Sequence, residues 1–211
     1  MTIQKKFRRK QEDRSSETRR ALFEATIAVI CEKGYAGAST ALIAERAKVT
    51  RGAVQHQFGT RVQLMAEVVR WVYDNETDEY SRATPAAGRK GLALDDWPAV
   101  LWRVLGKPSG IAVLDILWAT RSDPELAERV LPLQQELERL GLERLQRSTG
   151  ADPAMTLAQM RLLVWSVRGL VIAQSFVPNP DDVYPALDLL TRVLRRAAPS
   201  GGIEEIFQDA G

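Results

Sequence analysis

Hydrophobic residues recur along this chain at helical spacing, and no segment alternates strictly between apolar and polar positions. The first clear stripe follows intervals of three and four residues: Leu22, Ala25, Thr26, Val29 and Ile30. This spacing places the side chains on one face of an amphipathic helix. Ser16 is a suitable N-cap for that helix, and Gly34 is a suitable C′ residue to end it.

Two shorter helices are predicted next. The first begins at Ser39 or Thr40, either of which can serve as the cap, and a turn at 48–49 follows it. Its buried positions are Leu42, Ile43 and Ala47. Thr50 caps the next helix, which ends near Gly59. Two short helices joined by a tight turn, behind a longer first helix, form a helix-turn-helix arrangement.

The rest of the chain continues in helical pattern. A long helix is predicted over 61–80, and a stretch at 81–94 with proline and glycine reads as a connection. Further helices are predicted at 95–105, 109–122, 124–147, 154–177 and 181–197. Proline, glycine or an Asp-Pro pair marks each boundary between them. The predicted fold is therefore all-α, with about nine helices.

Charge is divided unevenly along the chain, although the formal net charge is only +2. Residues 1–64 carry 13 lysines and arginines against 6 acidic residues, and residues 65–211 carry 16 against 21. A basic first third indicates that this end of the chain meets a polyanion. Eight of the 13 cations precede residue 21, so a merely solvated basic arm over 1–15 is the alternative, and contact of that arm with DNA stays open.

Composition argues against an enzyme. The chain has 45% hydrophobic and 27% charged residues, which is ordinary for a soluble globular protein. His56 is the single histidine, so a histidine-rich metal site is excluded and a Ser-His-Asp set could use only this residue. No cofactor or metal is expected. The single cysteine, Cys31, fits a reducing cytoplasm, and no apolar run suggests a membrane span.

The helix after Thr50 has the residues that reading DNA requires. A reading helix needs small residues near its start and polar side chains on its exposed face. Gly52 and Ala53 allow the backbone to approach a groove, and Val54 and Phe58 point inward. The exposed polar residues are Arg51, Gln55, His56 and Gln57. Arginine can contact guanine and glutamine can pair with adenine, each contact giving roughly 1–3 kcal/mol of base discrimination.

The segment 18–64 resembles the DNA-binding domain of TetR-family transcriptional regulators. The matching residues are Thr18, Arg19, Leu22, Ala25, Glu32, Lys33, Gly34, Tyr35, Thr40, Ile43, Ala44, Ala47, Val49, Thr50, Gly52, Phe58, Arg61 and Leu64. The resemblance implies that the helix after Thr50 sits in the major groove. It also implies that Thr40 and Arg61 clamp phosphates.

Three residues depart from the family pattern. Gln55 stands where a phosphate-contacting tyrosine is usual, and Gln57 stands where histidine or tyrosine is common. Lys48 replaces a glycine in the turn, so a left-handed conformation there would cost about 1 kcal/mol. These departures affect the expected base contacts and leave the DNA-binding role in place.

The later helices are expected to hold a dimer interface. The helix at 154–177 has two apolar stripes, so one side can face its own core and the other a partner subunit. Together with the last helix, the expected interface residues are Val164, Val167, Val171, Leu187, Leu190 and Leu194. The alternative is a helix wholly buried within a monomer.

An apolar effector pocket is also expected in this part of the chain. Its candidate lining residues are Trp97, Trp102, Trp118, Arg121, Trp165, Arg168 and Phe176. Aromatic residues can line an apolar cavity, and an arginine can hold a polar or anionic ligand group. Ordinary core packing is the alternative for each aromatic residue.

These observations together predict a ligand-responsive repressor that binds a palindromic DNA operator as a cytoplasmic homodimer. The expected division is a flexible arm over 1–15, a DNA-binding domain over 16–64, a ligand-binding and dimerisation domain over 65–200, and a tail over 201–211. An all-α small-molecule or lipid-binding protein without a DNA role is the alternative. A small-molecule enzyme built on a helical bundle is a third possibility.

Overall fold

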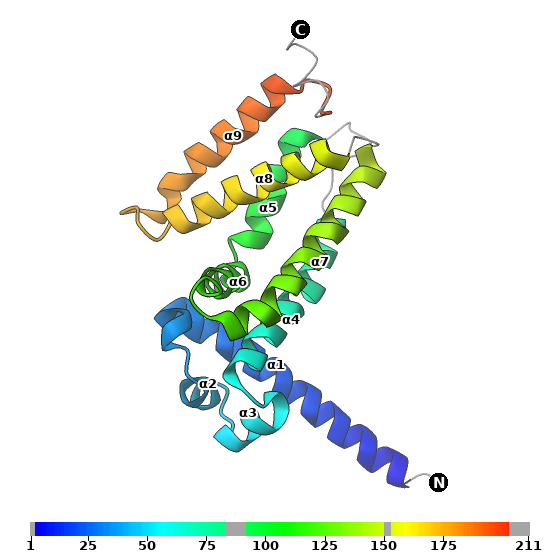
Figure 1. Ribbon diagram of the computed structural model, residues 1–211, viewed down its shortest axis with the longest axis vertical. Coiled ribbons are helices and arrows are strands. Elements are labelled where there is room, and N and C mark those ends of the chain that lie inside the picture. The colour runs from blue at the N-terminus through cyan, green and yellow to red at the C-terminus, as the bar shows by residue number, and fades with distance from the viewer. Residues whose placement is uncertain (1–2, 83–91, 150–152, 203–211) are drawn as a thin grey trace. The chain divides into compact units, whose positions relative to one another are not determined.

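A computed structural model describes residues 3–82, 92–149 and 153–202 of the chain (Figure 1). The helices are α1 (Ile3–Gly37), α2 (Thr40–Arg46), α3 (Arg51–Phe58), α4 (Arg61–Arg82), α5 (Trp97–Leu105), α6 (Pro108–Ala119), α7 (Pro124–Thr149), α8 (Pro153–Ala173) and α9 (Tyr184–Ala197). Two short 3-10 turns, η1 (Leu94–Asp96) and η2 (Pro180–Val183), precede α5 and α9. The described residues contain no strand, which confirms the all-α prediction.

Two compact units make up the chain. The first comprises Met1–Val72 with Ala112–Leu133, and the second comprises Tyr73–Ile111 with Gln134–Gly211. The sequence analysis placed one boundary after residue 64, between a DNA-binding domain and a ligand-binding domain, whereas each unit here is made of two separate segments. Ile116, Leu126 and Val130 are fully buried, so the segment 112–133 adds to the core of the first unit.

Helix α1 begins at Ile3, not at Ser16. Residues 3–15, expected as a flexible arm, therefore form the first turns of this helix, and Ser16 lies within it. The side chains before Ser15 lie outside the described residues, as do 83–91 of the expected connection and 203–211 of the expected tail. Gly34 interrupts the helix with φ 71° and ψ 168°, as expected of a glycine that ends a helix.

Side-chain caps define the helix-turn-helix. Ser39 is the N-cap of α2, because its side chain accepts a hydrogen bond from the backbone N–H of Leu42 at 3.3 Å. Thr50 is the N-cap of α3, and its Oγ1 accepts from the N–H of Ala53 at 3.1 Å. Between them Lys48 adopts φ 56°, the left-handed conformation that a glycine would adopt without strain.

A reciprocal cap begins α4. The backbone N–H of Thr60 donates to Gln63 Oε1 at 2.8 Å, and the N–H of Gln63 donates to Thr60 Oγ1 at 3.1 Å. This capping box satisfies two backbone donors at the start of the helix. Leu64, Val68 and Val72 are then buried along α4. The end of α3 and the start of α4 are thereby held in one defined turn.

The second unit is built on α5, α8 and α9. Its core cluster contains Leu94, Leu101, Leu163, Val167, Leu187, Leu194 and Ala198, and the half-buried residues against it include Trp97, Trp102, Val164 and Leu190. Val171 is also buried. The six residues expected at a dimer interface therefore belong to the interior of their own subunit or pack against it. Because α8 turns this stripe toward α5 and α9, the buried Val167, Val171, Leu187 and Leu194 are not available to a partner, whereas a place for the half-buried Val164 and Leu190 at an interface stays a prediction.

One segment of α8, Thr156–Ala173, is long and apolar enough to cross a membrane by length and composition alone, with a mean hydropathy of 1.2. Leu163, Val167 and Val171 of this segment are buried in the protein. A core helix of a soluble protein meets the same criterion, so the segment is weak evidence for a membrane span.

Candidate nucleic-acid interface

Helix α3 presents a polar face anchored from beneath by two apolar side chains. Val54 is 3% exposed and Phe58 is 6% exposed. The Phe58 ring packs against the Phe23 ring of α1, with their centroids 5.4 Å apart. Arg51, Gln55 and His56 are exposed, as the sequence predicted. Burial of one side of so short a helix therefore sets which side chains face outward.

Glycine at position 52 is not required by the protein itself. A Cβ atom built there would lie 3.8 Å from Thr50 Oγ1, which is ordinary van der Waals contact. Gly52 is exposed and Ala53 is half-buried. The small side chains near the start of α3 therefore leave room outside the protein, where a groove would approach.

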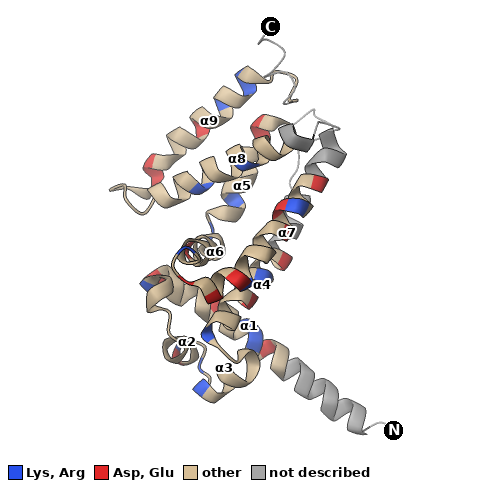
Figure 2. Cartoon of the chain, viewed as in Figure 1, with Lys and Arg blue, Asp and Glu red and all other residues tan. Residues whose placement is uncertain are grey.

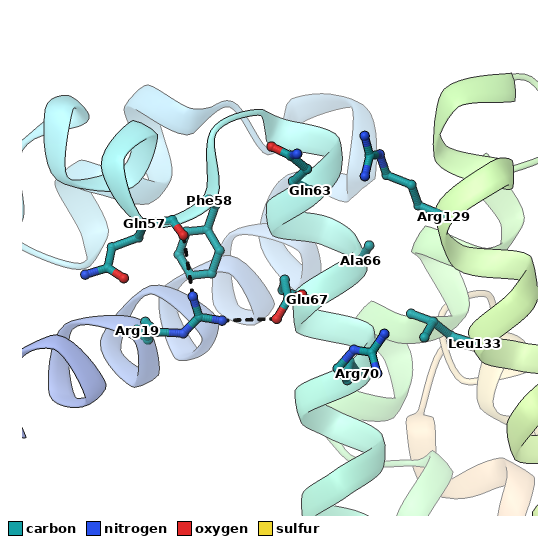
Figure 3. A pocket seen from close by; sticks show the side chains of 9 residues that line it. All are labelled: Arg19, Gln57, Phe58, Gln63, Ala66, Glu67, Arg70, Arg129 and Leu133. Atoms are coloured by element: carbon teal, nitrogen blue, oxygen red, sulfur yellow. Dashed lines mark hydrogen bonds and ion pairs between the residues drawn. The ribbon is translucent and has the colours of Figure 1, made fainter. Parts of the chain in front are cut away.

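Gln57 is turned toward α1 and does not share the exposed face. Its Nε2 donates to Ser15 Oγ at 3.1 Å, and its backbone carbonyl accepts from Arg19 Nη1 at 3.4 Å (Figure 3). Arg19 also forms an ion pair with Glu67 at 3.0 Å and lies 4.7 Å over the Phe58 ring. Gln57 thus holds α3 against α1, whereas Arg51, Gln55 and His56 lie on the exposed face.

Arg61 is engaged within the protein. Its Nε donates to the carbonyl oxygen of Ala38 at 2.8 Å, and its Nη2 donates to the carbonyl oxygen of Tyr35. These bonds join the start of α4 to the end of α1 and to the loop that follows it. The guanidinium implied as a phosphate clamp is therefore committed to backbone acceptors in this structure.

Tyr35 extends this contact to the segment 112–133. Its backbone N–H donates to Asp115 Oδ2 at 2.7 Å, and its hydroxyl donates to Asp123 Oδ2 at 2.9 Å. Burial raises the pKa of the Tyr35 hydroxyl. The N–H of Leu126, which donates to Asp123 at the start of α7, lowers the pKa of the Asp123 carboxyl. Sequence patterns did not indicate these contacts, because their partners are far apart along the chain.

Thr40 and Thr50 lie at the first turns of α2 and α3. Thr40 is the half-buried first residue of α2, and Thr50 is exposed. Close to α3 in sequence, cations lie in the turn before it, at Lys48, and at its first position, Arg51, among other lysines and arginines of the first unit (Figure 2). Arg46 and Glu32 form a two-fold hydrogen-bonded ion pair at 2.7 Å, which joins α2 to α1. The surface around α3 is therefore polar and carries cations at its start.

The residues expected to line an effector pocket differ widely in exposure and are divided between the two units. Trp118, Trp165 and Phe176 are 64%, 54% and 80% exposed, and Trp97 and Trp102 pack half-buried against the core of the second unit. Trp118 and Arg121 belong to the first unit, where the Arg121 guanidinium lies 4.5 Å over the Trp118 ring. Helical spacing alone did not show that Trp118 and Trp165 are exposed in the subunit, and their place in a pocket stays a prediction.

Arg168 is the exception among these residues. It is 6% exposed, its guanidinium lies 4.8 Å over the Trp165 ring, and its buried Nη1 has no hydrogen-bond partner among the described residues. A buried guanidinium nitrogen without an acceptor is costly, since it has lost water and gained nothing in exchange. This atom is therefore a candidate for contact with a ligand.

Several known proteins similar to this chain are transcriptional regulators. The family model described as bacterial regulatory proteins, tetR family, matches residues 22–68. The HTH-type transcriptional regulator CymR of Pseudomonas putida is 33% identical over 181 residues, which cover 78% of this chain and 83% of CymR. A transcriptional regulator from Rhodococcus sp. Rha1 shares the fold at a TM-score of 0.61 and 22% identity, over 84% of this chain and 96% of that one. The multidrug binding protein EbrR, in complex with imidazole, gives a TM-score of 0.59 at 24% identity, over 83% and 94%.

Proposed function

Because the chain belongs to the TetR family of bacterial transcriptional regulators, we propose that it represses transcription by binding a palindromic operator as a homodimer. The observation that carries this proposal is the exposed polar face of α3, held outward by buried Val54 and Phe58. A helix of this kind fits the major groove and reads base edges with its exposed side chains. The protein is proposed to act in the cytoplasm, without catalysing a reaction or entering a membrane.

Within this interface the residues have different roles. Arg51, Gln55 and His56 read bases, since they are exposed and can donate or accept hydrogen bonds. Gly52 and Ala53 allow close approach, and Thr40 and Thr50 contact phosphates at the starts of their helices. Gln57 and Arg61 act as positioning residues, because their polar groups already bind α1 and the loop after it.

A second copy of the chain is proposed to cover the outer face of α8 and α9. Large apolar side chains are exposed along both helices: Leu162, Trp165, Ile172, Phe176, Leu189 and Val193. Leu162, Trp165 and Ile172 lie on the side of α8 opposite to its buried stripe, at intervals of three and seven residues, and Phe176 follows four residues later, just beyond the end of the helix. Apolar surface of this extent is stabilised by burial against a partner. A two-fold dimer would present two copies of α3 to a palindrome.

A small, largely apolar effector is proposed to bind in the second unit and release DNA. Arg168 supports an effector that also carries a hydrogen-bond acceptor or a negative charge, because its buried Nη1 lacks a partner among the described residues. Helix α4 is the proposed connection, since its residues 61–72 belong to the first unit and its residues 73–82 to the second. A change at one end of a continuous helix can bias the other end.

Selection from a random duplex library tests the operator. We expect a palindrome with half-sites about one helical turn apart. For about six to ten phosphate contacts, affinity should fall ~10³–10⁵-fold between 50 and 200 mM salt. The double variant Arg51→Ala/Gln55→Ala should lose the selected preference while retaining most non-specific binding. Recovery of no common sequence, or a flat salt response, would contradict the proposal.

A further inference from the structure

A polar cleft of about 400 Å³ lies beside the contact between the end of α3 and α1, entirely within the first unit (Figure 3). Residues of α1, the end of α3, α4 and α7 line it. Its size falls within the range of small-molecule sites, which is roughly 300–1,000 Å³. None of the residues expected to line an effector pocket belongs to it.

The lining of this cleft carries excess positive charge. Three guanidinium groups, from Arg19, Arg70 and Arg129, share it with one carboxylate, from Glu67. Glu67 is paired with Arg19 at 3.0 Å. Arg70 and Arg129 are exposed and have no ion pair within the part of the chain that the structure describes. Figure 3 shows them reaching from α4 and from α7 toward the space between these helices.

We propose that this cleft binds a small multivalent oxyanion, such as a metabolite bearing phosphate or several carboxylate groups. Guanidinium forks match the oxygen geometry of both groups and bind them through charge-assisted hydrogen bonds. Two like charges facing one cleft repel each other when it is empty, and an anion between them removes that repulsion. The polar lining sets this ligand apart from the largely apolar effector proposed for the second unit.

The position of the two unpaired arginines favours a small anion over a DNA phosphate. Arg70 lies nine residues beyond Arg61 along α4, which corresponds to about 13 Å of helix. Arg129 lies on α7, whose first residue follows Asp123. Neither residue belongs to the helix-turn-helix formed by α2 and α3. The cleft meets α3 only through Gln57 and Phe58, at the end opposite to Arg51.

Occupancy of the cleft would alter the contact that holds the end of α3 against α1. Arg19 holds the carbonyl oxygen of Gln57 and the carboxylate of Glu67 at the same time. An anion bound beside them competes with Glu67 for this guanidinium, so the contact that holds the end of α3 changes. This effect on DNA rests on the proposed function, whereas binding of the anion does not.

Titration calorimetry on the full chain without DNA tests the site, with inorganic pyrophosphate as the probe and chloride at matched ionic strength. We expect saturable binding that Arg70→Gln/Arg129→Gln weakens at least tenfold. The control Lys33→Gln/Arg103→Gln removes the same charge from exposed positions outside the cleft and should bind as the unmodified chain does. Glu67→Gln should bind several-fold more tightly, because it removes the competing carboxylate. Circular dichroism verifies that each variant is folded.

Three results would overturn the proposal: no binding of pyrophosphate or citrate, equal loss in the cleft and control variants, or unchanged binding by the cleft variant. Comparing pyrophosphate with citrate identifies whether phosphate or carboxylate oxygens are preferred. A mixed-sequence duplex provides the DNA comparison. If the cleft variant lowers the salt slope by about two while pyrophosphate does not bind, the arginines contact DNA phosphates instead. Failure to find an operator would leave the calorimetric result unaffected.

Discussion

The guanidinium of Arg61 lies 4.0 Å over the ring of Tyr35, and it donates to the carbonyl oxygen of the same residue. This contact joins the start of α4 to the end of α1. Arg61 therefore supports the fold beside α2 and α3, and the phosphate contact that the family resemblance implied stays a prediction.

Replacing Arg61 by lysine should therefore reduce stability. Arg61→Lys keeps the charge but cannot reproduce the fork that satisfies the carbonyls of Tyr35 and Ala38. We expect the free energy of unfolding to fall by about 1–3 kcal/mol in urea denaturation. Arg51→Lys, at the exposed start of α3, is the control and should leave stability unchanged. Equal stability of the two variants would show that the Arg61 contact is unimportant to the fold.

Gly52→Ala should weaken DNA binding without lowering the stability of the fold. The new methyl group meets only Thr50 Oγ1 at 3.8 Å, and alanine favours a helix interior over glycine by roughly 0.5–1 kcal/mol. Thermal unfolding should thus show equal or higher stability. Affinity for the selected operator should fall about tenfold, since the methyl group occupies space at the groove, and that ratio corresponds to about 1.4 kcal/mol. Undiminished affinity would show that α3 does not approach DNA closely at this position.

The conformation of Lys48 predicts an unusual order of stabilities. At φ 56° a residue with a Cβ atom is strained, whereas glycine is not. Lys48→Gly should therefore be more stable than Lys48→Ala by about 1 kcal/mol, the reverse of the order on an exposed helix. Denaturant titration of both variants measures the difference. A more stable Lys48→Ala variant would contradict a left-handed turn.

Stability should depend on the ionisation of Asp123. Its pKa is lowered in the folded chain, mainly by the hydrogen bond from the N–H of Leu126 and then by the one from Tyr35. The resulting stabilisation is fully present above the pKa of the unfolded carboxyl, about 3.9, and is lost as the pH falls through the lower folded value. Asp123→Asn should flatten this acid limb in pH-dependent unfolding. An unchanged limb would assign the acid sensitivity to other carboxyls.

Charge placed on the outer face of α8, or just beyond its C-terminal end, should disrupt the proposed dimer. Leu162→Lys and Phe176→Lys alter side chains that are 63% and 80% exposed, so folding of the subunit should survive. Sedimentation should report a monomer. Relative to the unmodified chain, each variant should lose more affinity for a palindromic operator than for non-specific duplex. Leu131→Lys, which changes a residue of the first unit that is 42% exposed, is the matched control. Dimers that persist in both α8 variants would contradict this interface.

Local patterns were enough to predict the reading helix. The cap at Thr50, the inward side chains of Val54 and Phe58 and the end at Gly59 are all set within one short segment, because capping and helical periodicity are local effects. The strain at Lys48 was also predictable, since the conformation of a short turn depends on the residue type at that position.

Only the tertiary structure decided which of the two apolar stripes of α8 is buried within the subunit. Both stripes of α8 have helical spacing, but packing on α5 and α9 buries Val167 and leaves Trp165 exposed. Gln57 and Arg61 looked free in sequence, and only folding brought them to acceptors on α1 and the loop after it. Periodicity identifies an apolar or polar face of a helix, and the neighbour that meets this face comes from elsewhere in the chain. The sequence by itself therefore determined helix α3 and its buried side, whereas tertiary contacts decided the core, the cleft and which polar side chains of α3 stay exposed.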